Sequence, residues 1–216
     1  MPLLMLDLDN TLVDRDAAFR DATTAFLAEH ALPGSDVEWL MSIDASGYAP
    51  RQTVANAMAD RYGASLPESA IHLLLDHGAA DRVVLTEATC DALGSAIANG
   101  WTCTIVTNGR TAQQEAKIRN AGLDRLVHGW TISEAIGHRK PEPEIFKAAA
   151  VAVGASLHGA WVIGDSPQAD IVGAYGLDIQ SVWVSCGRPW TEAAYRPTHV
   201  ADDAASAIHY VLGTPT

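Results

Sequence analysis

The sequence has little positive charge for its length. It contains 14 Lys and Arg residues against 26 Asp and Glu residues in 216 positions, a formal net charge of −12. Nucleic-acid binding depends on clustered Lys and Arg side chains that neutralise phosphates, so we expect no nucleic-acid partner. An anionic substrate would need local positive charge from a metal ion or from a few well-placed basic side chains.

Long apolar runs and cysteine motifs are also lacking. No apolar stretch approaches the ~18 residues of a membrane span, and the opening MPLLML is too short for a signal-peptide core and has no basic flank. Cys90, Cys103 and Cys186 are scattered without metal-binding or redox spacing, which favours reduced thiols. These absences predict a soluble cytoplasmic protein with no membrane partner, and they leave the oligomeric state unknown.

Short apolar runs alternate with helical patterns through most of the chain. The runs are Leu3–Leu8, Thr102–Val106, Ala160–Ile163 and Ile179–Val184, and the helical patterns fall near residues 88–99, 111–121, 142–153, 168–175 and 203–212. This alternation is typical of βαβ units and predicts an α/β fold with a parallel sheet.

Residues 15–85 do not follow this alternation. They have mostly helical patterns, with breaks at Pro33-Gly34, Gly47–Pro50 and Pro67, and they contain no strand-like run. The sequence has no internal repeat and no Pro- or Ser-rich linker. We therefore expect one core, residues 1–14 and 86–216, that carries an inserted all-helical cap, residues 15–85.

Polar residues follow the predicted strands and include several carboxylates. Asp7 and Asp9 end the first run, and Asp165 and Asp170 follow the third. Because ligands of parallel sheets bind outside the carboxyl ends of the strands, we expect these side chains to meet at one rim. Carboxylates this close repel one another unless positive charge lies between them.

A hard divalent cation would explain this concentration of acid. Mg²⁺ prefers carboxylate and water oxygens, and Asp7, Asp165 and the backbone carbonyl of Asp9 would suit it. A carboxylate can also attack phosphorus to form an aspartyl-phosphate, an anionic encounter that Mg²⁺ and a lysine would screen. Lys140, in the loop segment RKPEP, is the only lysine at any of these predicted tips, and the proline that follows it disfavours helical geometry there.

Neutral polar groups complete the predicted rim. Thr107 and Asn108 end the second run and would donate hydrogen bonds to phosphoryl oxygens. Ser166-Pro167 is typical of a helix start, which would orient Asp165 and Asp170.

Four segments of the sequence together resemble the motifs of the haloacid dehalogenase-like (HAD) hydrolase superfamily, most of whose members are phosphatases. They are DLDNTLVD, IVTNG, RKPEPEIF and GDSPQADIVGA. The resemblance implies a Rossmann-like core with a helical cap of the C1 type. It assigns residue roles by position: Asp7 as nucleophile, Asp9 as general acid/base, Thr107 as phosphate-binding hydroxyl, Lys140 as the lysine that steadies the nucleophile, and Asp165 with Asp170 as acidic residues of the Mg²⁺ site.

The acid at position 9 favours phosphate-ester chemistry. Members of the superfamily that cleave carbon–halogen bonds lack an acid there, and phosphonate-cleaving members carry a small residue. The prediction is therefore Mg²⁺-dependent hydrolysis of a small-molecule phosphate monoester through an aspartyl-phosphate on Asp7. Two alternatives stay open: a sugar phosphomutase that uses the same intermediate, and a non-enzymatic phospho-accepting signalling module, although such modules lack a helical insert after the first strand.

The remaining candidates lie outside the four motifs. Asp44, Tyr48 and Arg51, in the segment SIDASGYAPR of the predicted cap, would contact substrate if this segment is more than a connection between helices. Arg188 follows the last predicted strand, which could place it near the rim, but packing is the favoured role for both Arg188 and Trp190. Asp14 is expected to begin a helix or to act as a hinge of the cap.

Overall fold

A computed structural model describes residues 1–214, and the chain divides into two compact units. The first unit joins Met1–Val13 to the segment from Leu85 onward, and the second is Asp14–Val84. None of the helices in the described part of the chain has the length and apolar character needed to traverse a lipid bilayer.

The first unit is built on a six-stranded parallel sheet of order β3-β2-β1-β4-β5-β6. Its strands are β1 (Leu3–Leu6), β2 (Thr102–Thr107), β3 (Gly129–Ile132), β4 (Trp161–Gly164), β5 (Gln180–Val184) and β6 (His199–Ala201). Every residue of β1, β2 and β4 is buried, as expected for central strands of a parallel sheet that is covered on both faces. The predicted α/β, Rossmann-like fold is confirmed.

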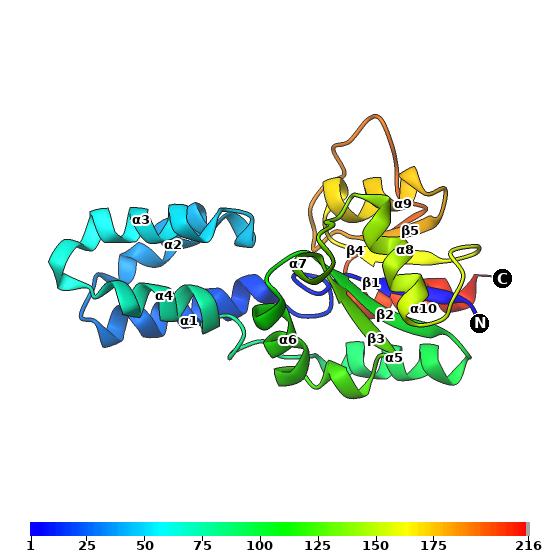
Figure 1. The fold of residues 1–216 in the computed structure, drawn as a ribbon, viewed down its shortest axis with the longest axis horizontal. Coiled ribbons are helices and arrows are strands. Elements are labelled where there is room, and N and C mark those ends of the chain that lie inside the picture. The colour runs from blue at the N-terminus through cyan, green and yellow to red at the C-terminus, as the bar shows by residue number, and fades with distance from the viewer. Residues whose placement is uncertain (215–216) are drawn as a thin grey trace. The chain divides into compact units, whose positions relative to one another are not determined.

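Helices cover both faces of this sheet. On one side, α5 (Glu87–Ala98) and α10 (Ala204–Gly213) contact each other and the strands, and on the other side α8 (Pro143–Ala152) and α9 (Val172–Gly176) do the same (Figure 1). Phe146 of α8 lies in an apolar cluster with Leu3 and Met5 of β1. Two further helices, α6 (Thr111–Asn120) and α7 (Ser133–Ile136), directly follow β2 and β3.

The sequence patterns missed β3 and β6, which form the two edges of the sheet. Both strands are short and only partly buried. An edge strand pairs with one strand only and is less buried than a central strand. It therefore needs no continuous apolar run and gives a weaker sequence signal.

The second unit is helical, as predicted for the insert. Its helices are α1 (Arg15–Glu29), α2 (Val37–Asp44), α3 (Arg51–Tyr62) and α4 (Glu68–His77), with short 3₁₀ turns at Gly34–Asp36, Ala45–Gly47 and Gly63–Ser65. Asp14 begins α1, because its carboxylate accepts a hydrogen bond from the backbone N–H of Ala17 at 2.8 Å. The prediction of a helix start at Asp14 is correct.

Candidate active site

The carboxyl end of β1 carries Asp7 and Asp9 on either side of a buried leucine. The Asp7 N–H donates to the carbonyl of Ile163 at 2.9 Å, which extends the pairing of β1 with β4 by one residue. Leu8 is buried, and its carbonyl accepts from the N–H groups of Leu12 and Val13 at 3.0 and 3.1 Å. This tight loop keeps Asp7 and Asp9 at the rim where the strand ends.

The carboxyl end of β4 supplies Asp165 and, one turn further on, Asp170. Ser166 begins the helical turn Pro167–Ile171, since its hydroxyl accepts from the Ala169 N–H at 3.2 Å. Asp170 folds back toward the strand, where its Oδ2 accepts from the Ser166 N–H at 3.1 Å. Gly164 makes this return possible, because a Cβ at that position would lie 2.6 Å from Asp170 Cβ and closer still to its carboxyl group.

Lys140 joins the two strand ends. Its buried Nζ donates to Asp7 Oδ1 at 2.6 Å and to Asp170 Oδ1 at 2.7 Å. Asn108, at the end of β2, holds the Lys140 main chain: its Nδ2 donates to the Lys140 carbonyl at 3.0 Å, and its Oδ1 accepts from the Lys140 N–H at 2.8 Å. Asn108 therefore positions Lys140, and its predicted contact with phosphate stays a prediction.

Three carboxylates lie together at this point of the site, and two of them bind the Lys140 ammonium. Asp7, Asp165 and Asp170 are buried, and each offers one carboxylate oxygen within 4.8 Å of the others. Three carboxylates and one ammonium leave an excess of negative charge in a place where water screens it poorly.

Burial and this excess of negative charge together shift the pKa values of the cluster. Burial, with added repulsion from Asp170 and Asp9, raises the pKa of Asp7 to about 7, although Lys140 opposes the rise. Burial, with repulsion from Asp7 and Asp170, raises the pKa of Asp165 to about 8 against the attraction of Arg188 and Lys140. Burial disfavours the charged form of Lys140, but Asp170 and Asp7 outweigh it and raise the pKa of Lys140 above its usual range. A set of hard oxygen donors with uncompensated charge fits a divalent cation such as Mg²⁺.

The side chain of Asp9 has different partners. Both of its carboxylate oxygens lie 2.7 Å from Lys117 Nζ, and Oδ2 also accepts from Gln114 Nε2 at 3.0 Å. Gln114 Nε2 also donates to Thr107 Oγ1 at 2.7 Å. Within the described residues, the grouping of Asp7, Asp165 and Asp170 does not include the Asp9 carboxylate, so the predicted contact of Asp9 with the metal depends on its backbone carbonyl.

Sequence reasoning gave Gln114 and Lys117 no role. Both lie on the buried face of α6 with Ile118. The spacing i, i+3, i+4 is the signal that could have found them, because turning Ile118 inward turns Gln114 and Lys117 inward too.

Arg188 lies at the rim, although packing is the role that the sequence favours for it. Its Nη2 donates to Asp165 Oδ2 at 3.1 Å and to the Asp165 carbonyl at 3.0 Å, so it contacts a predicted metal-site residue directly. Its guanidinium also lies 5.6 Å from the centre of the Trp183 ring. Trp190 does pack, with its ring 5.0 Å from that of Trp183 in an edge-to-face arrangement.

Two of the three candidates of the helical unit, Asp44 and Arg51, form an ion pair. Asp44 is fully buried, and it is bound by Arg15 through two contacts, by Arg51 Nη1 at 2.7 Å and by the Gly47 N–H at 2.8 Å. Tyr48 is exposed. Asp44 thus holds the turn after α2, and the predicted substrate contacts of Asp44, Tyr48 and Arg51 stay predictions.

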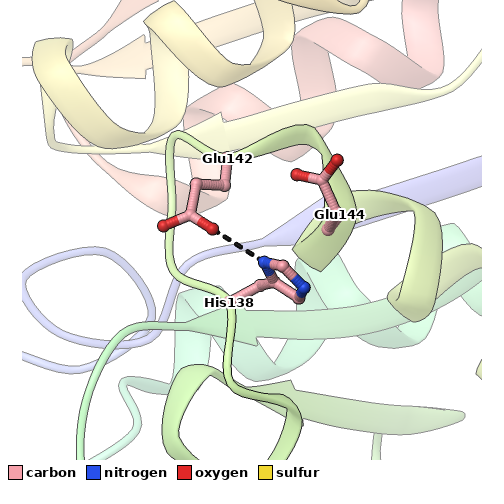
Figure 2. A group of neighbouring side chains, drawn as sticks. All are labelled: His138, Glu142 and Glu144. Atoms are coloured by element: carbon pink, nitrogen blue, oxygen red, sulfur yellow. Dashed lines mark hydrogen bonds and ion pairs between the residues drawn. The ribbon is translucent and has the colours of Figure 1, made fainter.

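A second group of possible metal ligands lies on the surface of the first unit. Figure 2 shows the Glu142 carboxylate facing the His138 ring, with Glu144 near the start of α8. His138 Nδ1 and Glu142 Oε2 are 2.8 Å apart, and all three side chains are exposed. An exposed ion pair and an acidic residue in the first turn of a helix explain this arrangement without a metal.

Comparisons with known proteins agree with the fold. Residues 137–207 match a family model described as HAD-hydrolase-like. The chain is 34% identical over 111 residues to phosphoserine phosphatase of Thermus thermophilus, a match that covers 51% of this chain and 45% of that protein, so it spans less than half the length of this relative. It is 28% identical over 222 residues to phosphoglycolate phosphatase of Mesorhizobium japonicum, which covers 96% of this chain and 89% of that protein.

A solved structure shares the fold over nearly the whole chain. The magnesium-bound YfnB protein of Bacillus subtilis, described as a HAD-hydrolase, has a TM-score of 0.74 at 23% identity, covering 97% of this chain and 98% of that chain. The family match includes Lys140, Asp165 and Asp170, and β1 supplies Asp7 beside them. The chain is thus similar to HAD-hydrolases in a family model over residues 137–207 and in fold over nearly its whole length.

Proposed function

We propose that this protein is a phosphatase that hydrolyses a small-molecule phosphate monoester in a Mg²⁺-dependent reaction, with Asp7 as the nucleophile. The observation that carries the proposal is the position of the Lys140 ammonium between Asp7 and Asp170, beside Asp165. The ammonium binds Asp7 Oδ1, so the candidate attacking atom is Asp7 Oδ2, which among the residues that the structure describes accepts only a long hydrogen bond of 3.5 Å from the Thr11 hydroxyl. The ammonium also holds positive charge where an anionic phosphoryl group would arrive.

The reaction has two steps in this proposal. An Asp7 oxygen forms a bond to phosphorus as the ester P–O bond breaks, and the departing alkoxide takes a proton from Asp9. Asp9 then removes a proton from water, whose oxygen attacks the aspartyl-phosphate. The bond between phosphorus and Asp7 breaks, and inorganic phosphate and the free carboxylate result.

Asp7, Asp165 and Asp170 are the side chains that would hold the cation, with the backbone carbonyl of Asp9. When bound, Mg²⁺ supplies positive charge that offsets the phosphoryl oxygens and the clustered carboxylates. The raised pKa values of Asp7 and Asp165 support this assignment, because burial and then the neighbouring carboxylates disfavour their charged forms, which a bound cation would stabilise.

A small phosphate ester is the substrate class we propose. The names of the relatives, phosphoserine phosphatase and phosphoglycolate phosphatase, support this class, since both name low-molecular-weight phosphate monoesters. The proposed partner is therefore a small metabolite.

The test is phosphate release across a panel of phosphorylated metabolites, with Mg²⁺ and with EDTA. We expect release that EDTA abolishes and that Asp7→Asn lowers by at least about 10³-fold, because the nucleophile is lost. Asp91→Asn, an exposed carboxylate on α5, is the matched control and should keep full activity. Undiminished release by Asp7→Asn would refute the nucleophile, and isomerised sugar phosphate without net release would assign a phosphomutase instead.

Mg²⁺ binding gives a readout that is independent of turnover. Calorimetric titration should show weaker binding to Asp170→Asn than to the unmodified protein, whereas Glu144→Gln, in the surface group of Figure 2, should leave binding unchanged. The opposite pattern would move the metal site to the surface group.

A further inference from the structure

Lys117 is a buried cation on α6 that pairs with Asp9. Its side chain is 2% exposed, and its Nζ lies 2.7 Å from both oxygens of the Asp9 carboxylate, which is 25% exposed. The two residues are 108 positions apart in the sequence. The pair therefore joins helix α6 to the loop that follows β1.

Burying this lysine costs free energy, and packing alone does not require a charged side chain at this position. Lysine is almost never fully buried unless it is paired, because removing an ammonium from water is unfavourable. An apolar side chain of similar length would fill the same space on α6 without that penalty. The positive charge at this position is therefore explained by its contact with the Asp9 carboxylate.

Gln114, one turn earlier on α6, ties Asp9 to the end of β2. Its Nε2 lies 3.0 Å from Asp9 Oδ2, 2.7 Å from Thr107 Oγ1 and 3.3 Å from the Asn108 carbonyl. Gly109 leaves room for this side chain, because an added Cβ would lie 2.9 Å from Gln114 Cγ. Its φ of +150° also favours glycine at this position. Lys117 and Gln114 together hold the Asp9 carboxylate from one side.

We infer that Lys117 is a positioning residue that, with Gln114, fixes the Asp9 carboxylate for proton transfer. This inference rests on the proposed function, in which Asp9 gives a proton to the leaving group and takes one from water. Each of the two aspartates then has its own buried lysine: Lys140 binds Asp7, and Lys117 binds Asp9. In this inference Lys117 acts through its contact with the Asp9 carboxylate.

The inference predicts a loss that depends on the leaving group. An alkyl phosphate releases a strongly basic alkoxide that needs the proton from Asp9, whereas p-nitrophenyl phosphate releases a stable phenolate that does not. A positioned acid contributes about 10²–10⁴-fold to a rate. Lys117→Met should therefore lower kcat/KM for an alkyl phosphate by about 10–100-fold and change kcat/KM for p-nitrophenyl phosphate by less than about threefold.

Two controls separate positioning from damage to the fold. Lys147→Met removes the one other lysine of the sequence, an exposed residue of α8, and should change neither value. Gln114→Met leaves the Lys117–Asp9 ion pair in place, so it provides the same test if Lys117→Met does not fold. It should show a smaller loss with the same dependence on the leaving group.

A double-mutant cycle with Asp9→Asn completes the test. If Lys117 acts through Asp9, adding Lys117→Met to Asp9→Asn should lower kcat/KM for the alkyl ester by less than about twofold more. Equal losses on both substrates, or losses that multiply in the cycle, would overturn the inference. If Asp7→Asn abolishes turnover but Asp9→Asn does not affect the alkyl ester, the proton role proposed for Asp9 fails, and the inference fails with it. If Asp9→Asn gives the selective loss and neither Lys117→Met nor Gln114→Met does, only the inference fails.

Discussion

Gly164→Ala should disable the proposed active site while the fold remains. The added Cβ would lie 2.6 Å from Asp170 Cβ, whereas ordinary carbon–carbon contact is about 3.5 Å, so the Asp170 side chain would have to retreat by about 1 Å. That shift would break the 2.7 Å contact of Asp170 with Lys140 and the 3.1 Å hydrogen bond from the Ser166 N–H. A misplacement of about 1 Å in an active site costs about 10²-fold in rate.

The same substitution should lower the free energy of unfolding by too little to unfold the protein. Overpacking costs about 1–3 kcal/mol, which a domain of ordinary stability withstands. We therefore expect Gly164→Ala to fold, to lose about 100-fold in phosphate release and to bind Mg²⁺ more weakly.

The assay compares phosphate release, Mg²⁺ titration and urea unfolding for this variant and for Gly94→Ala. Gly94 is an exposed glycine of α5 with no atom within 4 Å of an added Cβ, so alanine there should leave activity unchanged and slightly stabilise the helix. If Gly164→Ala kept full turnover and full Mg²⁺ affinity, Asp170 would not need its place beside Lys140, and the reasoning would be refuted.

Two further predictions concern the helical unit. Asp44→Ala removes the buried carboxylate that Arg15 contacts but leaves it Asp16 at 3.0 Å, so urea unfolding should show a loss of about 2–3 kcal/mol, and a loss below about 1 kcal/mol would contradict this account. Hydrogen bonds from Arg61, and from Tyr62 at 3.0 Å, lower the pKa of Asp36 in the folded protein. The ionised Asp36 therefore stabilises the fold fully above its unfolded pKa of about 3.9, and this stabilisation is lost as the pH falls through the lower folded pKa. Urea unfolding of the unmodified protein and of Asp36→Asn should therefore differ at pH 7 and converge at acid pH, and a difference that stays constant with pH would count against the pair.

Much of the fold could be predicted because central parallel strands carry their own signal. β1, β2 and β4 are buried on all their residues and therefore appear in the sequence as apolar runs. β3 and β6 are edge strands, and because they are only partly buried they do not appear in the sequence as apolar runs. The helical insert was readable because it interrupts the alternation of strands and helices.

The candidate site was predictable where neighbours in sequence are neighbours in space. Asp7 and Asp9 share one loop, and Asp165 and Asp170 share one helical turn that Ser166 begins. Arg188 could not be assigned in this way, since its contact with Asp165 depends on where the loop after β5 turns.

The sequence by itself determined the kinds of groups and their local spacing: the aspartate pairs, the glycine before Asp165, the helix starts and the buried strand runs. Tertiary structure alone decided which ammonium meets which carboxylate. Lys140 reaches Asp7 across 133 positions and Lys117 reaches Asp9 across 108, because the sheet order sets β1 between β2 and β4. Any lysine within reach can neutralise a carboxylate, so only the packing of the chain can choose between them.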